Sequence, residues 1–205
     1  MRLVPILTPI LLLLAACSPL TTTKSDSTTE SEANDIGPQM EALQSINGDF
    51  DGDGEMDCAT LYHIPKQTIS GDSTTLNKEI EESYIVAFDN ESISPKRSPR
   101  RLSHLTLLGD VDLDGKDEYG VYTHSANNYD SSWGDYSAYS MQDSTWRSIA
   151  STTLNISLLE GLGNEIDFNN LIIADSIHQG RVIVQHFTIL DGQSCEISEE
   201  RVELV

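Results

Sequence analysis

Two stretches of this chain repeat one acidic pattern, and this repeat constrains the fold more than any other feature. Residues 47–63 read NGDFDGDGEMDCATLYH and residues 108–124 read LGDVDLDGKDEYGVYTH; they align without a gap at an offset of 110 − 49 = 61 residues. Each copy has Asp at positions one, three and five, Gly at six and an acidic residue at nine. These residues are Asp49, Asp51, Asp53, Gly54 and Asp57 in the first copy, and Asp110, Asp112, Asp114, Gly115 and Glu118 in the second. An internal repeat of this kind indicates one structural unit used twice.

The crowded carboxylates of each copy predict a site for a hard divalent cation. Two carboxylates about 5 Å apart repel each other by roughly 3 kcal/mol at an effective dielectric constant of about 20. A tight loop that turns at a Gly and offers oxygen atoms from alternate residues suits calcium. No His or Cys stands at a ligand position, which disfavours softer metals. The alternative is a solvated acidic turn that binds no ion.

The sequence after each loop excludes a helical EF-hand. Position twelve, which should be a bidentate Glu, is Thr60 in the first copy and Val121 in the second. Each loop runs instead into β-branched and aromatic sequence, CATLYHI or YGVYTHS, which has strand character. A D-x-D-x-D-G-x-x-D loop followed by a short apolar strand resembles the FG-GAP/VCBS repeats of integrin-type β-propellers, and the resemblance covers about residues 44–140.

The resemblance implies a set of calcium ligands in each loop. They would be the side chains of Asp49, Asp51, Asp53 and Asp57 with the backbone carbonyl of Glu55, and the side chains of Asp110, Asp112, Asp114 and Glu118 with the backbone carbonyl of Lys116. Asp117, at position eight, is expected to face outward. A propeller usually has at least four blades, whereas the acidic repeat occurs twice, so we expect no closed propeller.

The rest of the chain shows short strand-like runs and no convincing helical stripe. Strands are predicted near 80–88, 102–108, 135–142, 144–150, 152–159, 170–177, 181–190 and 196–204. Turn signals such as Asp89-Asn90 and Asp191-Gly192 separate them. The expected fold class is therefore all-β: a partial β-propeller-like module or a β-sandwich with two calcium loops, formed by residues 44–205 as a calcium-binding domain.

Residues 1–16 predict a lipoprotein signal peptide that is cleaved. The apolar run within them is too short to span a bilayer, which requires about 20 residues. It leads into LAAC at 14–17, which resembles the lipobox of bacterial lipoproteins, and this implies that Cys17 is lipidated with chains such as palmitate. The alternative is an ordinary secretory peptide with Cys17 as a bystander. Ser18 after the lipidated Cys favours the bacterial outer membrane, lipid-anchored and either periplasmic or surface-exposed.

Residues 17–43 are expected to be the lipidated Cys followed by a flexible tether, because the segment is rich in Ser and Thr and has little apolar surface to bury. The chain has 33 Asp and Glu against 12 Lys and Arg, a formal net charge of −21, which argues against nucleic acid as a partner. The expected partners are the lipid bilayer, through the N-terminal acyl anchor, and a protein or glycan of the envelope.

These features predict a calcium-binding, membrane-anchored envelope lipoprotein that acts as a binding or scaffolding module. Motifs such as H-E-x-x-H and G-x-S-x-G are absent from the sequence, so an enzyme is the less favoured class. The alternative function is an envelope hydrolase with structural calcium and unidentified catalytic residues.

The two cysteines other than Cys17 are Cys58 and Cys195. In an oxidising compartment they can form a disulfide, which would stabilise the chain by about 4 to 5 kcal/mol according to the chain-entropy estimate. The alternative is two buried thiols that never meet.

Overall fold

The structure, a computed structural model, describes residues 39–69, 78–125, 133–191 and 194–204. The predicted signal peptide, Cys17 and most of the predicted tether lie outside the described residues. The strands and the one helix of the described part are β1 (Glu41–Gly48), β2 (Asp57–Ile64), β3 (Gln67–Ile69), β4 (Lys78–Ile80), β5 (Ser83–Phe88), β6 (Lys96–Ser98), β7 (Leu102–Gly109), β8 (Glu118–His124), β9 (Trp133–Gln142), β10 (Thr145–Asn155), α1 (Ile156–Gly161), β11 (Ile172–Ala174), β12 (Arg181–Leu190) and β13 (Ser194–Glu203).

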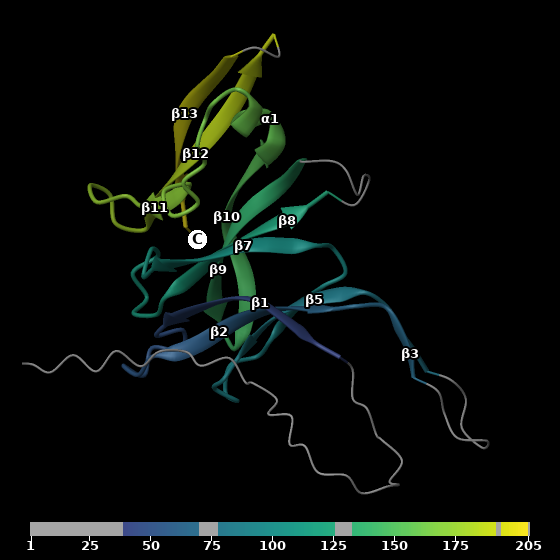
Figure 1. The fold of residues 1–205 in the computed structure, drawn as a ribbon. Helices are drawn as coiled ribbons and strands as arrows, with labels where there is room; N and C mark the ends of the chain where they lie inside the picture. Colours follow the sequence, from purple (N-terminus) through teal and green to yellow (C-terminus); the bar gives the residue numbers. More distant parts are fainter. Residues whose placement is uncertain (1–38, 70–77, 126–132, 192–193, 205) are drawn as a thin grey trace, which may run out of the picture.

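Most of these strands form three antiparallel sheets. The first sheet has the order β1-β2-β5-β6, the second β10-β9-β8-β7 and the third β11-β12-β13, and β3 and β4 form a separate hairpin between β2 and β5. Figure 1 shows the sheets as successive layers, with the first sheet low in the view, the second in the middle and the third at the top. The sheets do not close into a propeller, and the expected all-β class is confirmed.

The first two sheets are copies of one unit. The first acidic loop joins β1 to β2 and the second joins β7 to β8, so each loop connects the first two strands of its sheet. The registers agree as well, because Gly48 pairs with Asp57 in the first sheet and Gly109 pairs with Glu118 in the second. The sequence repeat is therefore a repeat of strand, acidic loop and strand.

Two hydrophobic clusters lie between the three layers. One cluster, which includes Phe50, Leu61 and Tyr119, fills the space between the first and second sheets. The other, which includes Val111 and Val184, lies between the second and third sheets. The second sheet is thus covered on both faces, and β8 is buried along nearly its whole length. Burial on both faces fixes the position of the loop that enters β8.

Besides shorter strands and the added short strands β3, β4 and β6, the folded part differs from the predicted elements at β1, at β10 and at α1. β1 begins at Glu41, inside the segment predicted as a tether that ends at residue 43. β10 is one continuous strand where two were predicted. Ile156–Gly161 is a short helix instead of the end of a strand, because the Asn155 side chain caps it by accepting a hydrogen bond from Leu158 N at 2.9 Å. Among the described residues no helix combines the length and apolar character needed to cross a membrane.

Candidate metal centres

The two acidic loops fold through the same hydrogen bonds. In both, the carboxylate at position one accepts from the N–H of Gly at six, the carboxylate at three accepts from the N–H at five, and the carboxylate at five accepts from the N–H at seven. The donor–acceptor distances are 2.9, 3.2 and 2.8 Å in the first loop and 3.1, 3.2 and 3.0 Å in the second. The Gly residues at six, Gly54 and Gly115, have φ values of 87° and 89°, which residues with a Cβ rarely adopt. The acidic side chains therefore shape the loop as well as charge it.

The residue at position two anchors each loop in the core. Phe50 is fully buried, and its ring meets Phe88 edge to face with the ring centroids 5.3 Å apart. Val111 takes the same position in the second loop and is 3% exposed. The N–H of each anchor donates to the carboxylate at position nine, over 3.2 Å from Phe50 N to Asp57 and 2.8 Å from Val111 N to Glu118. Position nine is thereby held beneath the loop, at the start of the next strand.

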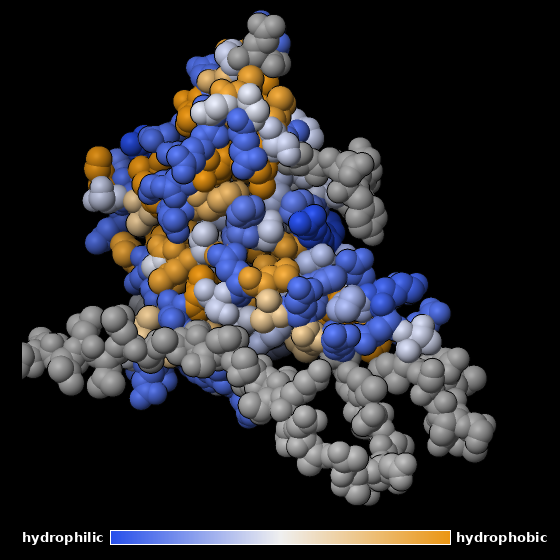
Figure 2. All heavy atoms as spheres, viewed as in Figure 1, coloured by the Kyte–Doolittle hydropathy of each residue, from blue (hydrophilic) through white to orange (hydrophobic). Residues whose placement is uncertain are grey.

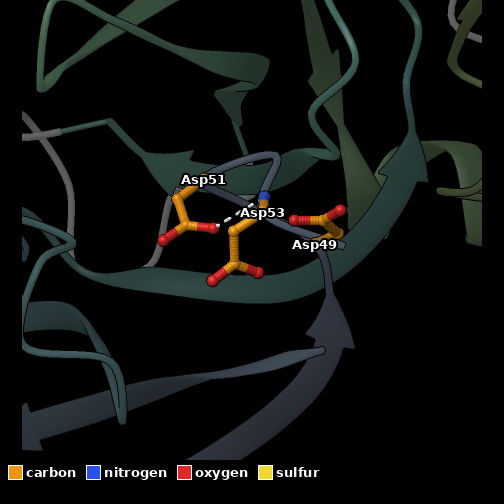
Figure 3. A group of neighbouring side chains, drawn as sticks. All are labelled: Asp49, Asp51 and Asp53. Atoms are coloured by element: carbon orange, nitrogen blue, oxygen red, sulfur yellow. Dashed lines mark hydrogen bonds between the residues drawn. The ribbon is translucent and has the colours of Figure 1, made fainter. Parts of the chain in front are cut away.

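Three carboxylates converge in the first loop. Asp49, Asp51 and Asp53 each place an oxygen within 4.8 Å of the others, so the group could hold a metal ion. Figure 3 shows Asp53 between the other two, with the hydrogen bond from its N–H to Asp51 drawn dashed. Asp57 is not in this group. Glu55 contacts the loop through its backbone N–H, which donates to Asp53.

The second loop brings together a different set. Asp110, Asp112 and Glu118 lie within the same 4.8 Å limit and could also hold a metal ion. Asp114 is instead paired with Lys116, whose ammonium lies 3.6 Å from its Oδ2 and also donates to the carbonyl of Met141 at 3.1 Å. The carbonyl oxygens of Glu55 and Lys116 remain predicted ligands.

The second loop contains buried oxygens that lack partners. Asp110 Oδ1 and Glu118 Oε1 are buried, and the structure gives neither a hydrogen-bond partner among the described residues. Glu118 is fully buried, and this burial, together with the neighbouring Asp112 carboxylate, raises its pKa to about 8. An ionised carboxylate is costly to bury unless a cation or donor compensates it. The second loop therefore lacks one positive charge or donor at its buried end.

The first loop meets the same requirement with an amide. Asn90 Nδ2 donates to Asp51 Oδ2 and to Asp57 Oδ1, both at 2.9 Å, and Ser92 Oγ also reaches Asp51 Oδ2 at 3.2 Å. Burial raises the pKa of Asp57, and the hydrogen bond from Asn90 opposes that rise. Sequence reasoning missed Asn90 as part of the site because it lies 33 residues after Asp57 and carries no acidic pattern.

The two loops also contact each other, which corrects the expectation that Asp117 faces outward. Asp117 N donates to Asp49 O at 2.7 Å, and Asp49 N donates to Asp117 Oδ2 at 2.9 Å. The approach is close, because a Cβ added to Gly48 would lie 3.0 Å from Asp117 Oδ2 and 2.7 Å from Leu107 Cδ1. Position eight of the second loop thus connects it to position one of the first.

Replacing Asp117 by Ala should destabilise the fold. The change removes the acceptor of a charge-assisted hydrogen bond, so we expect a loss of about 1 to 2 kcal/mol, or roughly 3 to 6 °C in melting temperature. Asp117→Asn, which keeps an acceptor oxygen, should recover much of this loss. Thermal melts of the three proteins measure the effect, and an Ala variant that melts with the wild type would show that the bridge contributes nothing.

The third sheet contains a related turn that the sequence analysis did not identify. It is one residue shorter than the acidic loops, because Ala174 pairs with Val182 at position eight, whereas Gly48 and Gly109 pair with position nine. Asp175 directly follows β11, and Gly180, five residues later with a φ of 75°, matches Gly54 and Gly115. Ile177 occupies position three. The Asp175 side chain is 1% exposed and its Oδ2 lies 3.0 Å from His178 Nδ1 and 3.3 Å from Arg201 Nε. The spacing of Asp at one and Gly at six was the available sequence signal.

The disulfide between Cys58 and Cys195 is not formed, because Cys195 is a free thiol. Cys58 lies in β2 of the first sheet and Cys195 in β13 of the third, with the second sheet between these layers in Figure 1. A disulfide requires Cα atoms within about 7 Å of each other, and a whole intervening sheet separates these strands by more than that.

A cleft of about 370 Å³ lies between the first two sheets, away from the acidic loops, and is lined by Leu43, His63, Glu82, Tyr84, Pro99, Arg101, Leu102 and Ser103. His63 Nε2 lies 3.0 Å from Glu82 Oε1, and the His63 ring stacks on Tyr84 with the centroids 4.8 Å apart. Ser103 Oγ lies 3.0 Å from Nε2 of His124, whose pKa is lowered by burial. A His and a carboxylate therefore converge in a cleft outside the loops.

Comparison of the chain with protein-family models, curated proteins and solved structures finds no match.

Proposed function

We propose that this chain is a calcium-binding envelope lipoprotein, anchored to the bacterial outer membrane by acyl chains on Cys17, whose FG-GAP/VCBS-type β module binds or scaffolds other envelope components. The observation that carries the calcium proposal is the pair of buried, unpartnered oxygens, Asp110 Oδ1 and Glu118 Oε1, in an acidic loop. A cation at this point compensates both oxygens at once. The N-terminal sequence supports the anchor, and export exposes the loops to calcium.

The donor set favours calcium over other metals. Both candidate groups offer carboxylate oxygens and contain no His or Cys. Oxygen-only sites suit calcium, magnesium and manganese, but magnesium prefers to keep its waters in a strict octahedron, whereas calcium accepts an irregular protein cage. The loops supply acidic side chains at irregular spacing, which is the arrangement that calcium tolerates.

Calcium titration of the full chain tests this proposal. After chelator treatment, calorimetry should detect binding with a dissociation constant in the range of about 10⁻⁴ to 10⁻³ M that is typical of extracellular modules. Magnesium should bind more weakly, and Asp112→Ala should remove most of the contribution of the second loop. The proposal fails if calcium produces neither binding heat nor a rise in melting temperature.

The third sheet supports a binding role, because it carries exposed apolar side chains, namely Ile173, Ile177, Leu190 and Ile197, which are 37%, 75%, 44% and 53% exposed. In Figure 2 hydrophobic residues gather around this sheet at the top of the view. Exposed apolar surface of this kind often marks contact with another molecule. A pull-down from envelope fractions, with and without calcium, should recover a partner that an unrelated lipoprotein does not retain; identical recoveries would remove the support for this role.

An envelope hydrolase is the second candidate, and the cleft is the observation that favours it. Ser103 lines the cleft together with His63 and Glu82, and its Oγ lies at hydrogen-bond distance from His124. A hydroxyl next to a neutral imidazole is the arrangement that nucleophilic catalysis uses. Ester turnover that Ser103→Ala abolishes would favour the enzyme, whereas turnover unchanged by Ser103→Ala would exclude this cleft as its site.

A further inference from the structure

The residue opposite position nine differs between the two acidic loops. In the first sheet Ala59 pairs with Phe88, so two residues further along each strand Asn90 lies opposite Asp57. In the second sheet Gly120 pairs with Ala138, and the same count places Ser140 opposite Glu118. Residues directly opposite each other in an antiparallel pair project to the same face. Asn90 and Ser140 therefore occupy equivalent places beneath the two loops.

The first loop is already satisfied at its buried end. Asn90 donates to one oxygen of Asp51 and one of Asp57. A cation that enters this loop meets carboxylates whose buried oxygens have donors, so binding must share or displace those hydrogen bonds. This lowers the net gain from the ion.

The second loop has no such donor. Ser140 is fully buried and its Oγ has no hydrogen-bond partner among the described residues, as is also true of Asp110 Oδ1 and Glu118 Oε1. The serine side chain is shorter than asparagine and carries one hydroxyl in place of an amide with two N–H groups. Folding has already removed these oxygens from water, so a cation that binds here displaces the proton of Glu118 but no hydrogen-bond donor of the protein.

Charges at the rim of the loops act in the opposite direction but more weakly. Position seven is Glu55 in the first loop and Lys116 in the second, which favours cation attraction to the first. Glu55 is exposed, and the Lys116 ammonium is engaged by the Asp114 carboxylate and the Met141 carbonyl. Screened pairs of this kind change affinity by a factor of about five or less, whereas a buried charge-assisted hydrogen bond corresponds to about tenfold or more.

The third sheet contains a related, shorter turn in which basic side chains of the chain lie against the buried carboxylate. Asp175 at position one is buried, and the side chains of His178 and Arg201 lie against its carboxylate. The carboxylates at positions three and five are replaced by Ile177 and Gln179, so no cage remains. The buried carboxylates of the three turns thus differ in their side-chain partners. Asp175 has basic side chains and Asp57 has an amide, whereas Glu118 accepts only from backbone N–H groups and its Oε1 has no partner among the described residues.

We propose that the two acidic loops bind calcium unequally: the second loop holds the tighter ion, and the residue opposite position nine, Asn90 or Ser140, sets the difference. This inference rests on the proposed calcium binding. The ion in the second loop compensates its buried, unpartnered oxygens. The first loop stays folded without an ion and binds calcium only at a higher concentration.

Calcium calorimetry on the full chain and its variants tests the inequality. The wild type should show two phases whose dissociation constants differ by about tenfold or more, as expected for the loss or gain of one buried charge-assisted interaction. Glu118→Gln should remove the tighter phase and Asp51→Ala the weaker one. Asn90→Ser, which gives the first loop the residue of the second, should strengthen the weaker phase by about tenfold. Ser140→Asn should weaken the tighter phase.

Ser92→Ala is the matched control. Ser92 Oγ contacts Asp51 Oδ2 at 3.2 Å and Asn90 Oδ1 at 2.7 Å from an exposed position, and its loss leaves both amide donors of Asn90 in place, so the weaker phase should change much less than in Asn90→Ser. Circular dichroism checks that each variant folds, and Asn90→Ser keeps the test decisive if the buried Ser140→Asn variant does not fold. Equal affinities in the wild type, or loss of the tighter phase in Asp51→Ala, would overturn this inference while leaving calcium binding intact. A wild type that shows neither calcium heat nor a calcium-dependent melting temperature would overturn both.

Discussion

The Glu118→Gln variant should be more stable than the wild type in chelator and less stable than the wild type in calcium. In chelator at neutral pH the variant is expected to melt above the wild type, because the wild type must either bury an unpartnered carboxylate or keep it protonated, and its pKa of about 8 records that cost. Removing such a group is expected to change stability by about 1 to 3 kcal/mol, or roughly 3 to 8 °C for a protein of this size.

In millimolar calcium the wild type should instead melt above Glu118→Gln. The cation then compensates Glu118 and Asp110 together, and mass action adds about 0.5 to 1.5 kcal/mol for each occupied site if the dissociation constants lie near 10⁻⁴ to 10⁻³ M. The amide of Gln weakens the site and gains little from the ion. Differential scanning calorimetry measures the melting temperatures of both proteins in both buffers.

Asp57→Asn is the matched control for this crossing, because Asp57 holds position nine of the first loop and already has the Asn90 amide as a partner. Like the wild type, Asp57→Asn should melt at a higher temperature in millimolar calcium than in chelator. If wild type and Glu118→Gln melt together in both buffers, the unpartnered oxygens have no energetic consequence and the calcium proposal loses its main support.

Replacing Cys17 by Ser should abolish acylation completely. The sulfur of Cys17 is the only atom on which the lipobox chemistry can begin, so the effect is all or none. Cells fed radiolabelled palmitate should label the wild-type protein and not the variant. A single acyl chain anchors only marginally, whereas two or more hold a protein stably in a bilayer.

Cys195→Ser is the matched control for the labelling experiment, because Cys195 is a free thiol that lies in β13, far along the chain from the lipobox. It should label like the wild type. Palmitate that persists on Cys17→Ser would contradict the lipoprotein prediction and with it the proposed membrane anchor, but it would leave the two acidic loops unaffected.

The sequence by itself determined the local features of this protein. Asp at one, three and five, Gly at six and an acidic residue at nine specify a tight loop because each acidic side chain bonds to a backbone N–H two to seven residues away. The strands that follow are β-branched and aromatic, so the all-β class could be predicted from the same segment. Such contacts are local, and local contacts can be read from spacing along the chain.

The prediction failed or was silent where partners lie far apart in the sequence. Whether a buried carboxylate has a donor depends on the strand that pairs beside it, so Asn90 and Ser140 could not be assigned to the loops before the register was known. The bridge from Asp117 to Asp49 likewise requires two loops to meet across a sheet boundary, and a pattern-based reading placed Asp117 in solvent.

The third loop and the cysteines show the same division. Asp175 and Gly180 keep the spacing of the repeat, but Arg201, which neutralises Asp175, comes from the next-but-one strand, β13, and only the sheet brings it there. Cys58 and Cys195 could pair by composition, yet the layered order of the sheets keeps them apart. Sequence spacing determined which groups form each loop. The packing of three sheets decided which of those groups are buried, which have partners and which are left for a cation. Burial and hydrogen-bond partners depend on surfaces that meet only after folding, so spacing along the chain cannot give them.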